Sequence, residues 1–520
     1  MDLLTLLWLV PIIGMALVLL APRLLGRVVS LIATLATLVI SVLVWQQFST
    51  TEGGTQLITR VGWIEQFSIQ YHVGVDGLSM ALILLTGVIA VIGVIASWNI
   101  GAETHREGTE KAYFAMYLLL VAGMYGFFVA QDLILFYVFF ELTLLPMYFL
   151  IGVWGGPRRE YAAIKFFLYT LFGSVFMLVA ILALYFQSGP ESARTFSIPE
   201  LAERGLGLPV TVVNWLWIGF YLGFAIKVPI FPFHTWLPDA HVEAPTPISV
   251  ILAGVLLKMG TYGLVRMNVQ VLGGASEKLW TFLAVVAVVN IVYGSFCAMA
   301  QKDLKKLVAY SSVGHMGFVL LGIAARTPEG LNGAVFQMVS HGLLSGMLFL
   351  IVGVIYNRAH HRYIVYPDDP ELLRLYHIDP SKAGKPGFGG LATTMPVYTG
   401  IMTVAFFGSL GLPGMSGFIG EALALMGAWR VYPVLTIISA IGILLGAAYF
   451  LWTIQRMFLG DENPEWEGLP DINGRELLAL VPLAILVVVL GVLPWIATNL
   501  SAATVDGLQV VETMRSLAKL

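Results

Sequence analysis

The chain has 520 residues, of which 58% are hydrophobic and only 11% are charged, with a formal net charge of −3. Soluble domains are nearer one quarter charged, so the lipid bilayer is the expected solvent for most of this sequence. The lack of a basic patch argues against nucleic-acid binding, and the single cysteine, Cys297, excludes a disulfide framework and a thiolate-bound iron–sulfur cluster within the chain.

Apolar runs of membrane-crossing length recur from one end of the chain to the other. A crossing helix needs about 20 apolar residues. We therefore expect an all-α, polytopic membrane protein with about fourteen transmembrane helices of this length. The expected spans are 3–21, 28–46, 78–98, 113–130, 133–152, 163–187, 211–232, 247–269, 279–300, 306–325, 331–357, 395–428, 434–459 and 476–497.

Two of these spans, 211–232 and 395–428, are expected to be discontinuous. Two prolines follow Lys227 closely, and Pro413 precedes Glu421. A proline inside a helix removes a backbone hydrogen bond, and free backbone groups at membrane depth are tolerated only beside protein or a water-filled cavity. A charge beside a broken helix in two parts of the chain is typical of transporters built of inverted repeats. The alternative for either break is a simple packing kink.

The expected inverted repeats are residues 113–269 and 279–459, with five helices each. Residues 1–112 then form three N-terminal transmembrane helices, and residues 460–520 hold the last transmembrane helix and a C-terminal tail. Lys and Arg concentrate in the loops after the odd-numbered spans, so the positive-inside rule places both termini on the outer face.

Two polar stretches, 47–77 and 358–394, are expected to be surface loops. The second would lie on the inner face, where partner subunits could dock. Neither is large enough for a nucleotide-binding domain, and the chain has no glycine-rich phosphate loop.

Four ionisable residues stand out within the apolar spans: Glu141, Lys227, Lys258 and Glu421. A charge at the bilayer centre costs at least about 2.5–3.5 kcal/mol, so each needs a reason. One reason would be a structural ion pair between Glu141 and Lys227, but a buried pair adds little net stability. A lysine whose proton affinity depends on a nearby glutamate can also load and release a proton, which is what a relay needs.

Three histidines, His234, His315 and His341, are further candidates, because histidine titrates near neutral pH. Each could instead be an ordinary hydrogen-bonded packing residue. We favour the relay role for His315 and leave His341 and His234 open. His241 is expected near a membrane face, and no histidine spacing suits a metal or haem site, so we expect no metal or cofactor in this chain.

Three long motifs carry a resemblance to a known family. They are KVPIFPFHTWLPDAHVEAPTPIS at 227–249, DLKKLVAYSSVGHMG at 303–317 and GLPGMSGFIGE at 411–421. The sequence resembles the antiporter-like subunits of proton-pumping NADH:quinone oxidoreductase (complex I), a family that includes multisubunit cation/proton antiporters and membrane-bound hydrogenases. The likeness covers nearly the whole chain. Glu421 favours the M type, since L and N types usually have lysine there, and the chain lacks the long lateral helix of the L type.

The resemblance implies a subunit of an H⁺-translocating enzyme complex, with no redox centre in this chain. Flavin, iron–sulfur clusters and quinone would belong to other subunits, and partners would include other antiporter-like subunits of the membrane arm. The implied location is a bacterial plasma membrane. The implied proton relay consists of Glu141, Lys227, Lys258, His315 and Glu421, with His234 and His341 as possible members.

Several alternatives stay open at this stage. The chain could belong to a cation/proton antiporter, to a membrane-bound hydrogenase, or, as a D-type subunit, to a photosynthetic complex I-like enzyme in a thylakoid. A scaffold without transport is disfavoured, because scaffolding needs no buried charges. The stretch 358–394 is longer than expected for the family and could mark a lineage-specific contact.

Overall fold

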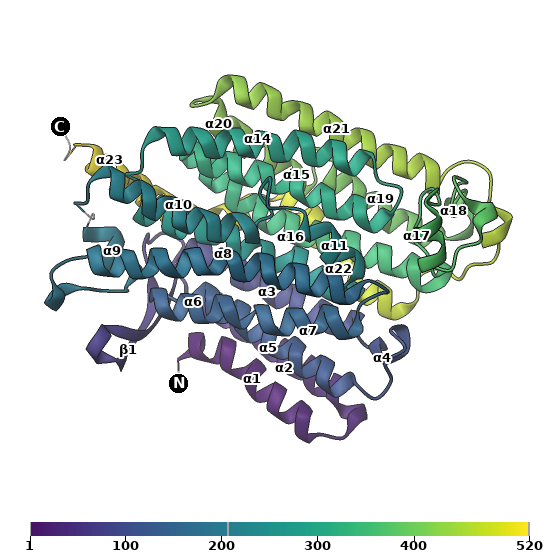
Figure 1. Cartoon of the computed structure of the whole chain (residues 1–520), viewed down its shortest axis with the longest axis horizontal. Coiled ribbons are helices and arrows are strands. Elements are labelled where there is room, and N and C mark those ends of the chain that lie inside the picture. The colour runs from purple at the N-terminus through teal and green to yellow at the C-terminus, as the bar shows by residue number, and fades with distance from the viewer. Residues whose placement is uncertain (1, 205–206, 518–520) are drawn as a thin grey trace.

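Long, roughly parallel helices make up most of the molecule (Figure 1). The computed structural model describes residues 2–204 and 207–517, so the end of the predicted C-terminal tail, 518–520, lies outside the described residues. Within them, thirteen helices are long and apolar enough to cross a membrane, which confirms the all-α polytopic class. These helices are α1 (Leu3–Leu20), α2 (Gly26–Gln47), α3 (Gly77–Ala96), α5 (Glu110–Val129), α6 and α7 together (Leu133–Trp154), α8 (Arg159–Gln187), α10 (Val210–Lys227), α12 to η5 (Thr246–Val271), α14 (Glu277–Met299), α15 (Leu304–Ala325), α16 (Pro328–Ala359), α21 (Pro433–Met457) and α22 (Gly474–Val492).

The remaining predicted span, 395–428, consists of two half-helices, α19 (Pro396–Ser409) and α20 (Ser416–Trp429). Each has 14 residues, too few to cross a bilayer alone. Between them, Gly411 and Gly414 adopt positive φ angles of 81° and 93°, which glycine accepts without steric cost. The predicted discontinuity of this span is therefore confirmed.

The other predicted break is also present, because α10 ends at Lys227 and α11 begins only at Trp236. The prolines in this gap leave backbone groups without helical partners. Asn290 of α14 satisfies two of them: the Phe231 N–H donates to Asn290 Oδ1 at 2.8 Å, and Asn290 Nδ2 donates to the Pro229 carbonyl at 3.3 Å. Protein groups thus replace the missing helical hydrogen bonds, as membrane depth requires.

Two further irregularities are not predicted by the sequence pattern. The helix at 133–154 is interrupted at Thr143, and the helix at 246–271 contains π-helical turns on both sides of Lys258. Single π-turns inside helices are frequent at functional sites. The segments are α6 (Leu133–Leu142), α7 (Leu144–Trp154), α12 (Thr246–Ile251), η4 (Leu252–Leu256), α13 (Leu257–Gly263) and η5 (Leu264–Val271).

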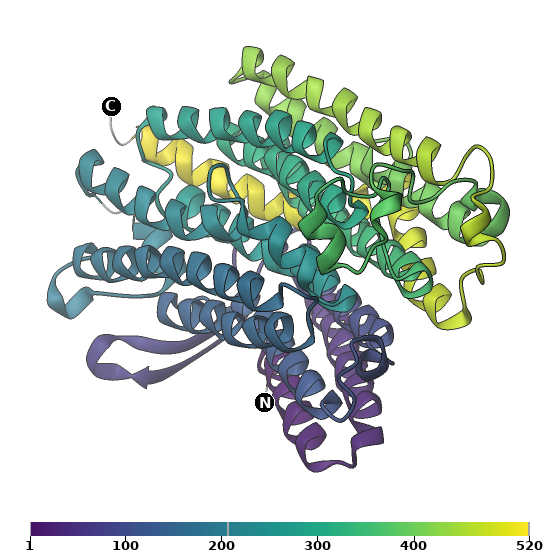
Figure 2. The same ribbon diagram turned by 45° about the vertical axis from the view of Figure 1, so that its right-hand side comes forward.

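The stretch 47–77, expected as a loop, contains an antiparallel hairpin of β1 (Gln56–Ile64) and β2 (Ile69–Val75). Figure 2 shows it projecting from one end of the helix bundle, which we call the hairpin end. Alternating β-branched and aromatic residues favour this pairing over a loop. The hairpin is the one departure from an all-α fold among the described residues.

The stretch 358–394 lies at the opposite end, the loop end, and is only partly a surface loop (Figure 1). His361 and Arg362 are buried. Arg362 forms an ion pair with Asp303, the N-cap of α15, at 2.9 Å. These contacts tie the first part of this surface stretch to the bundle.

The predicted C-terminal tail is helical up to Leu517 and forms α23 (Trp495–Leu517). It packs on α3 and α16. The Gly77 N–H donates to Thr504 Oγ1 at 2.9 Å, and Ser501 Oγ donates to Asn332 Oδ1 at 2.7 Å. Short helices complete the described chain: α4 (Ile100–Glu103), α9 (Ile198–Arg204), α11 (Trp236–Glu243), α17 (Pro370–Leu375), α18 (Leu391–Thr394), and the 3-10 turns Arg23–Leu25, Glu65–Phe67, Glu191–Ala193, Pro380–Lys382 and Pro464–Trp466.

The two predicted helix breaks fall in the two predicted repeats, one in 113–269 and one in 279–459. The repeat boundaries themselves stay a prediction. What the fold establishes is that each half of the chain brings a helix break close to buried charges.

Candidate functional site

Four of the seven predicted site residues form one row of buried side chains. Lys258 Nζ lies 2.7 Å from His341 Nδ1. The rings of His341 and His315 follow, with their centroids 5.7 Å apart. His315 Nδ1 then lies 2.9 Å from Glu421 Oε1. The four residues come from α13, α16, α15 and α20, so residues far apart in sequence are brought into one line.

Lys258, at the start of this row, is fully buried. Its amine donates to the carbonyl of Ala253, in the π-helical turn η4, at 2.5 Å, and its other described partner is His341. Within the described residues it forms no ion pair with a carboxylate. An unpaired buried charge is costly, and passing a proton to a neighbouring group removes that charge. The group beside Lys258 that can exchange a proton with it is the imidazole of His341.

Glu421, at the other end of the row, is 3% exposed and lies in α20, just after the helix break. Besides His315, its carboxylate accepts a hydrogen bond from Gln337 Nε2 at 3.4 Å. A Cβ atom on Gly411 would come within 3.2 Å of Glu421 Oε2. The break loop thus packs directly against the carboxylate, and glycine leaves room for it.

The other predicted pair, Glu141 and Lys227, is less direct than expected. Lys227 Nζ donates to Thr143 Oγ1 at 3.3 Å and lies 4.8 Å from the ring centroid of Phe140. Glu141 is only partly buried and has the Ser174 hydroxyl as a hydrogen-bond partner. The two charges interact electrostatically, but no direct ion pair joins them within the described residues. Glu141 and Lys227 are thus coupled by charge while each has a hydroxyl group as its hydrogen-bond partner.

His234 does not join the row. It is buried in the break after α10, against Phe231, Tyr293 and Tyr310. The structure therefore places His234 beside aromatic side chains rather than beside Lys258 or Glu421.

His241 is fully buried and stacks on Phe349, with ring centroids 4.4 Å apart, and its place near a membrane face stays a prediction. Its ring interacts electrostatically with two lysines, Lys258 of the row and Lys305. Lys305 is also buried and donates to the Ala244 carbonyl at 2.5 Å. The sequence did not single out Lys305, because its place in the first turn of α15, beside the Asp303 cap, is typical of a loop-end charge.

A cavity of about 600 Å³ opens at the loop end of the bundle, beside Lys305. Its lining includes Glu243, Arg358 and Arg362. Arg358 is paired with Glu476 at 2.7 Å. The cavity therefore brings the charged side chains of Glu243, Arg358 and Arg362 close to the buried Lys305.

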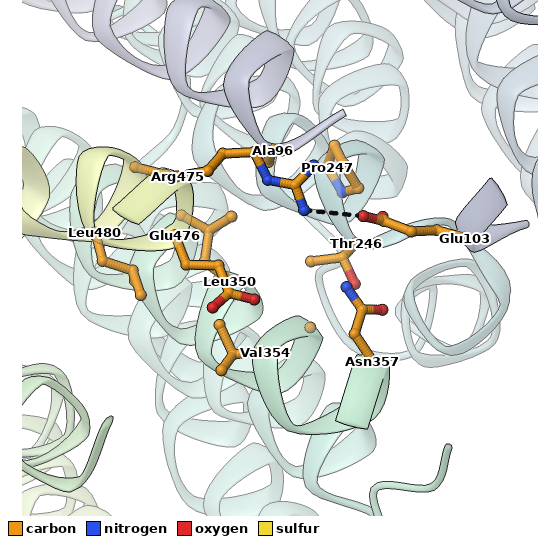
Figure 3. Close-up of a pocket in the computed structure, with 12 residues that line it drawn as sticks. Ala96, Glu103, Thr246, Pro247, Leu350, Val354, Asn357, Arg475, Glu476 and Leu480 are labelled. Carbon is orange, nitrogen blue, oxygen red and sulfur yellow. Dashed lines mark hydrogen bonds and ion pairs between the residues drawn. The ribbon is translucent and has the colours of Figure 1, made fainter. Parts of the chain in front are cut away.

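A smaller cavity of about 40 Å³ shares part of this lining (Figure 3). Figure 3 shows Arg475 reaching across it to Glu103, and the two pair at 3.1 Å. Burial raises the pKa of the Glu103 carboxyl, although Arg475 beside it opposes the shift. No cluster of three or more metal-ligating side chains occurs among the described residues.

Comparison with known proteins identifies the family. Residues 130–370 and 386–446 match the family described as NADH:quinone oxidoreductase/Mrp antiporter, transmembrane. The chain belongs to this family. All seven predicted site residues lie inside the matched segments, whereas residues 371–385, within the long stretch at the loop end, lie outside them.

Named relatives place the chain more closely within the NADH:quinone oxidoreductase/Mrp antiporter family. NADH-quinone oxidoreductase subunit M of Rickettsia felis is 39% identical over 93% of this chain and 92% of its own length. NAD(P)H-quinone oxidoreductase chain 4 1 of Synechococcus elongatus is 41% identical over 89% and 82%. A chain of respiratory complex I from Thermus thermophilus has a TM-score of 0.82 and 28% identity over 97% of this chain and 99% of its own. The chain is thus an integral, multi-pass protein of the M-type group.

Proposed function

We propose that this chain is the proton-translocating M-type subunit in the membrane arm of a complex I-type NADH:quinone oxidoreductase of a bacterial plasma membrane. The observation that carries the proposal is the buried row from Lys258 through His341 and His315 to Glu421. Its members are all protonatable, and each lies beside the next. The named relatives among NADH-quinone oxidoreductases support the same assignment.

The row moves a proton by short steps between neighbouring groups. The Lys258 ammonium gives a proton to His341 Nδ1, at 2.7 Å. The proton continues to His315, and His315 Nδ1 gives it to the Glu421 carboxylate at 2.9 Å. From Glu421, beside the helix break, it leaves toward the outer face. Only protons move in these steps, and no electron transfer is required of this chain.

Lys258 is reloaded through the groups between it and the large cavity. His241 interacts with both Lys258 and Lys305, and Lys305 lines the cavity of about 600 Å³ together with Glu243. This arrangement supplies protons from the loop end, which the positive-inside rule assigns to the inner face. The relay thus has an inner source and an outer outlet.

Glu141 and Lys227 control the row by their charge. When Lys227 is positively charged and turned away from Glu141, its field disfavours a second positive charge on Lys258 of the neighbouring helix. When Lys227 approaches Glu141, that repulsion weakens and Lys258 can take up a proton. His234 lies off the row and has no part in this scheme.

Electron transfer belongs to other subunits in this proposal. Flavin, iron–sulfur clusters and quinone would lie outside this chain, and neighbouring antiporter-like subunits would transmit the coupling. Lys258→Ala in the whole complex, reconstituted in vesicles, tests the assignment. We expect an assembled complex that no longer pumps protons through this subunit, measured as a lower ratio of protons to electrons. An unchanged ratio would refute the function.

A cation/proton antiport function is the second candidate, since the matched family includes Mrp antiporters. The same vesicles distinguish the two. Proton transport that persists without Na⁺ supports the complex I role, whereas transport that requires Na⁺ supports antiport.

A further inference from the structure

Glu243, the last residue of α11, is a buried carboxylate at the loop end and is only 5% exposed. It lines the cavity of about 600 Å³ and also a third cavity, of about 40 Å³. Two groups donate to its oxygens: the Arg158 N–H to Oε2 at 2.9 Å, and the Tyr376 hydroxyl to Oε1 at 3.1 Å. Within the described residues Glu243 forms no ion pair, so Tyr376 is the one side chain there that donates to this carboxylate.

We propose that Tyr376 is a positioning residue for proton uptake, whose hydroxyl holds the Glu243 carboxylate in place to collect protons from the large cavity and pass them to Lys305. The inference rests on the proposed relay function. It adds to that function a proton-collecting residue, Glu243, and the residue that orients it. Tyr376 does not carry the proton itself.

Tyr376 belongs to the long stretch at the loop end, and residues 371–385 of that stretch lie outside the segments that match the family. It follows the last residue of α17, the helix that buries Leu373. The Tyr376 ring packs edge-on against Tyr363, with the ring centroids 6.0 Å apart. The stretch therefore brings to the large cavity a hydroxyl that the matched segments do not contain.

Tyr376 and Glu243 lie at the boundary between two cavities, because both residues line the large cavity and the third cavity. Of the basic residues around them, Arg158 and Lys306 line only the third cavity, whereas Lys305 lines only the large one. The hydrogen bond to Oε1 thus fixes the carboxylate in the wall that it shares with Lys305.

The Tyr376 hydroxyl is suited to hold a carboxylate without giving up its own proton. Burial, together with the negative charge of Glu243, raises the pKa of Tyr376 above its ordinary value. The phenol therefore stays protonated and remains a donor. A hydrogen bond to an ionised acceptor is about twice as strong as a neutral one, and each carboxylate oxygen keeps a second lone pair for an incoming proton.

Lys305 is the next group along this route. Its amine donates to the carbonyl of Ala244, the residue after Glu243, at 2.5 Å, and it interacts electrostatically with Glu243. Glu243 takes up a proton at a carboxylate oxygen and gives it to the uncharged amine of Lys305. An O–H bond breaks, an N–H bond forms, and no electrons move. Since such a transfer depends on orientation, a carboxylate that is free to rotate passes its proton more slowly.

Tyr376→Phe in the assembled complex tests the proposal, because it removes only the hydroxyl and keeps the ring packed on Tyr363. We expect proton pumping in vesicles to slow about tenfold, the effect of one lost hydrogen bond to a charged group. Hydrogen exchange of residues 358–394 should stay unchanged. If the hydroxyl served only to dock the stretch, that exchange would quicken instead.

A double-mutant cycle shows whether Tyr376 acts through Glu243. Glu243→Gln cannot collect a proton and should slow pumping at least as much as Tyr376→Phe does. Tyr376→Phe added to Glu243→Gln should have no further effect, because no carboxylate is left to hold. A further loss of the size seen in Tyr376→Phe alone would overturn the proposal.

The matched control is Tyr363→Phe, in the same stretch and also beside the third cavity. Within the described residues its hydroxyl forms no hydrogen bond with Glu243, so we expect normal pumping. An equal loss in this control would overturn the proposal, and so would normal pumping by assembled Tyr376→Phe. Either result leaves the relay function intact, because Lys258→Ala tests that function separately.

Discussion

Lys227 donates a hydrogen bond to Thr143 at 3.3 Å and forms no direct ion pair with Glu141 within the described residues. Thr143 sits at the interruption between α6 and α7, and its own hydroxyl proton goes to the Phe140 carbonyl at 2.8 Å. The hydroxyl oxygen is therefore available as an acceptor for the lysine. The helix interruption thus supplies an alternative partner that competes with Glu141 for Lys227.

The first prediction removes this alternative partner. Thr143→Val keeps the shape of the side chain but deletes the hydroxyl, so Lys227 should move toward Glu141 and stay there. We expect proton pumping to fall by roughly 5- to 150-fold, which corresponds to the ~1–3 kcal/mol that a lost buried hydrogen bond costs. Pumping is measured in vesicles with the assembled complex.

Thr143→Ser is the matched variant, because it keeps the hydroxyl and removes only a methyl group. It should pump close to the normal rate. Equal loss in the serine and valine variants would show that packing against Gly123, which Thr143 contacts closely, matters more than the hydrogen bond.

The second prediction concerns the charge of Glu141. Glu141→Gln is nearly isosteric and cannot ionise, so Lys227 loses the carboxylate that competes for it. We expect the complex to assemble and proton pumping to be abolished. Lys227→Ala should have the same outcome. A normal ratio of protons to electrons in an assembled Glu141→Gln complex would remove this pair from the mechanism.

The third prediction tests whether the position of a protonatable group at residue 421 matters more than the sign of its charge. Glu421→Ala deletes the acceptor for His315 and should slow pumping at least about tenfold, since a positioned acid–base group contributes more than that. Glu421→Lys keeps a protonatable group at the same place and should be milder. Normal coupling in the alanine variant would exclude Glu421 from the path. The measurement compares initial pumping rates at saturating NADH among the unchanged protein, Glu421→Ala and Glu421→Lys.

The sequence identifies residues whose type is unusual inside a membrane span. It does not identify contacts that depend on how separate helices pack together. A charge inside an apolar span identifies Lys258 and Glu421, and prolines beside such charges identify both helix breaks. Nothing in the spacing of His315 and His341 shows that they face each other, because they lie on different helices.

The hairpin and the burial of His241 were not predicted, for different reasons. Periodicity identifies helices of membrane-crossing length but gives short strands little weight, so residues 56–75 read as a loop. His241 lies between polar residues in sequence, and only the fold of the break after Lys227 buries it. Local composition cannot report a contact made by Phe349, more than a hundred residues away.

The last prediction concerns His361, which anchors the long stretch at the loop end. Its ring stacks on Phe388 at 4.4 Å, with Trp466 at 5.0 Å. The Tyr363 N–H donates to Nδ1, and Nε2 contacts the Tyr366 hydroxyl, each at 3.2 Å. Nδ1 must therefore stay unprotonated. Burial, with a smaller effect from Lys382, lowers the pKa of His361 to about 4.

This shift makes the docking of the stretch depend on pH. The folded state binds a proton less readily than the unfolded state, whose histidine has a pKa of about 6.5, so the stabilisation is complete above that pH. It is lost as pH falls from about 6.5 toward 4, and it amounts to about 3 kcal/mol at most.

Hydrogen exchange of residues 358–394 should therefore quicken on acidification. His361→Phe should flatten the dependence, because a ring of similar shape remains but cannot be protonated. His377→Asn, at an exposed histidine of the same stretch, should leave the dependence unchanged. An unaltered pH profile in His361→Phe would mean that another group controls the docking.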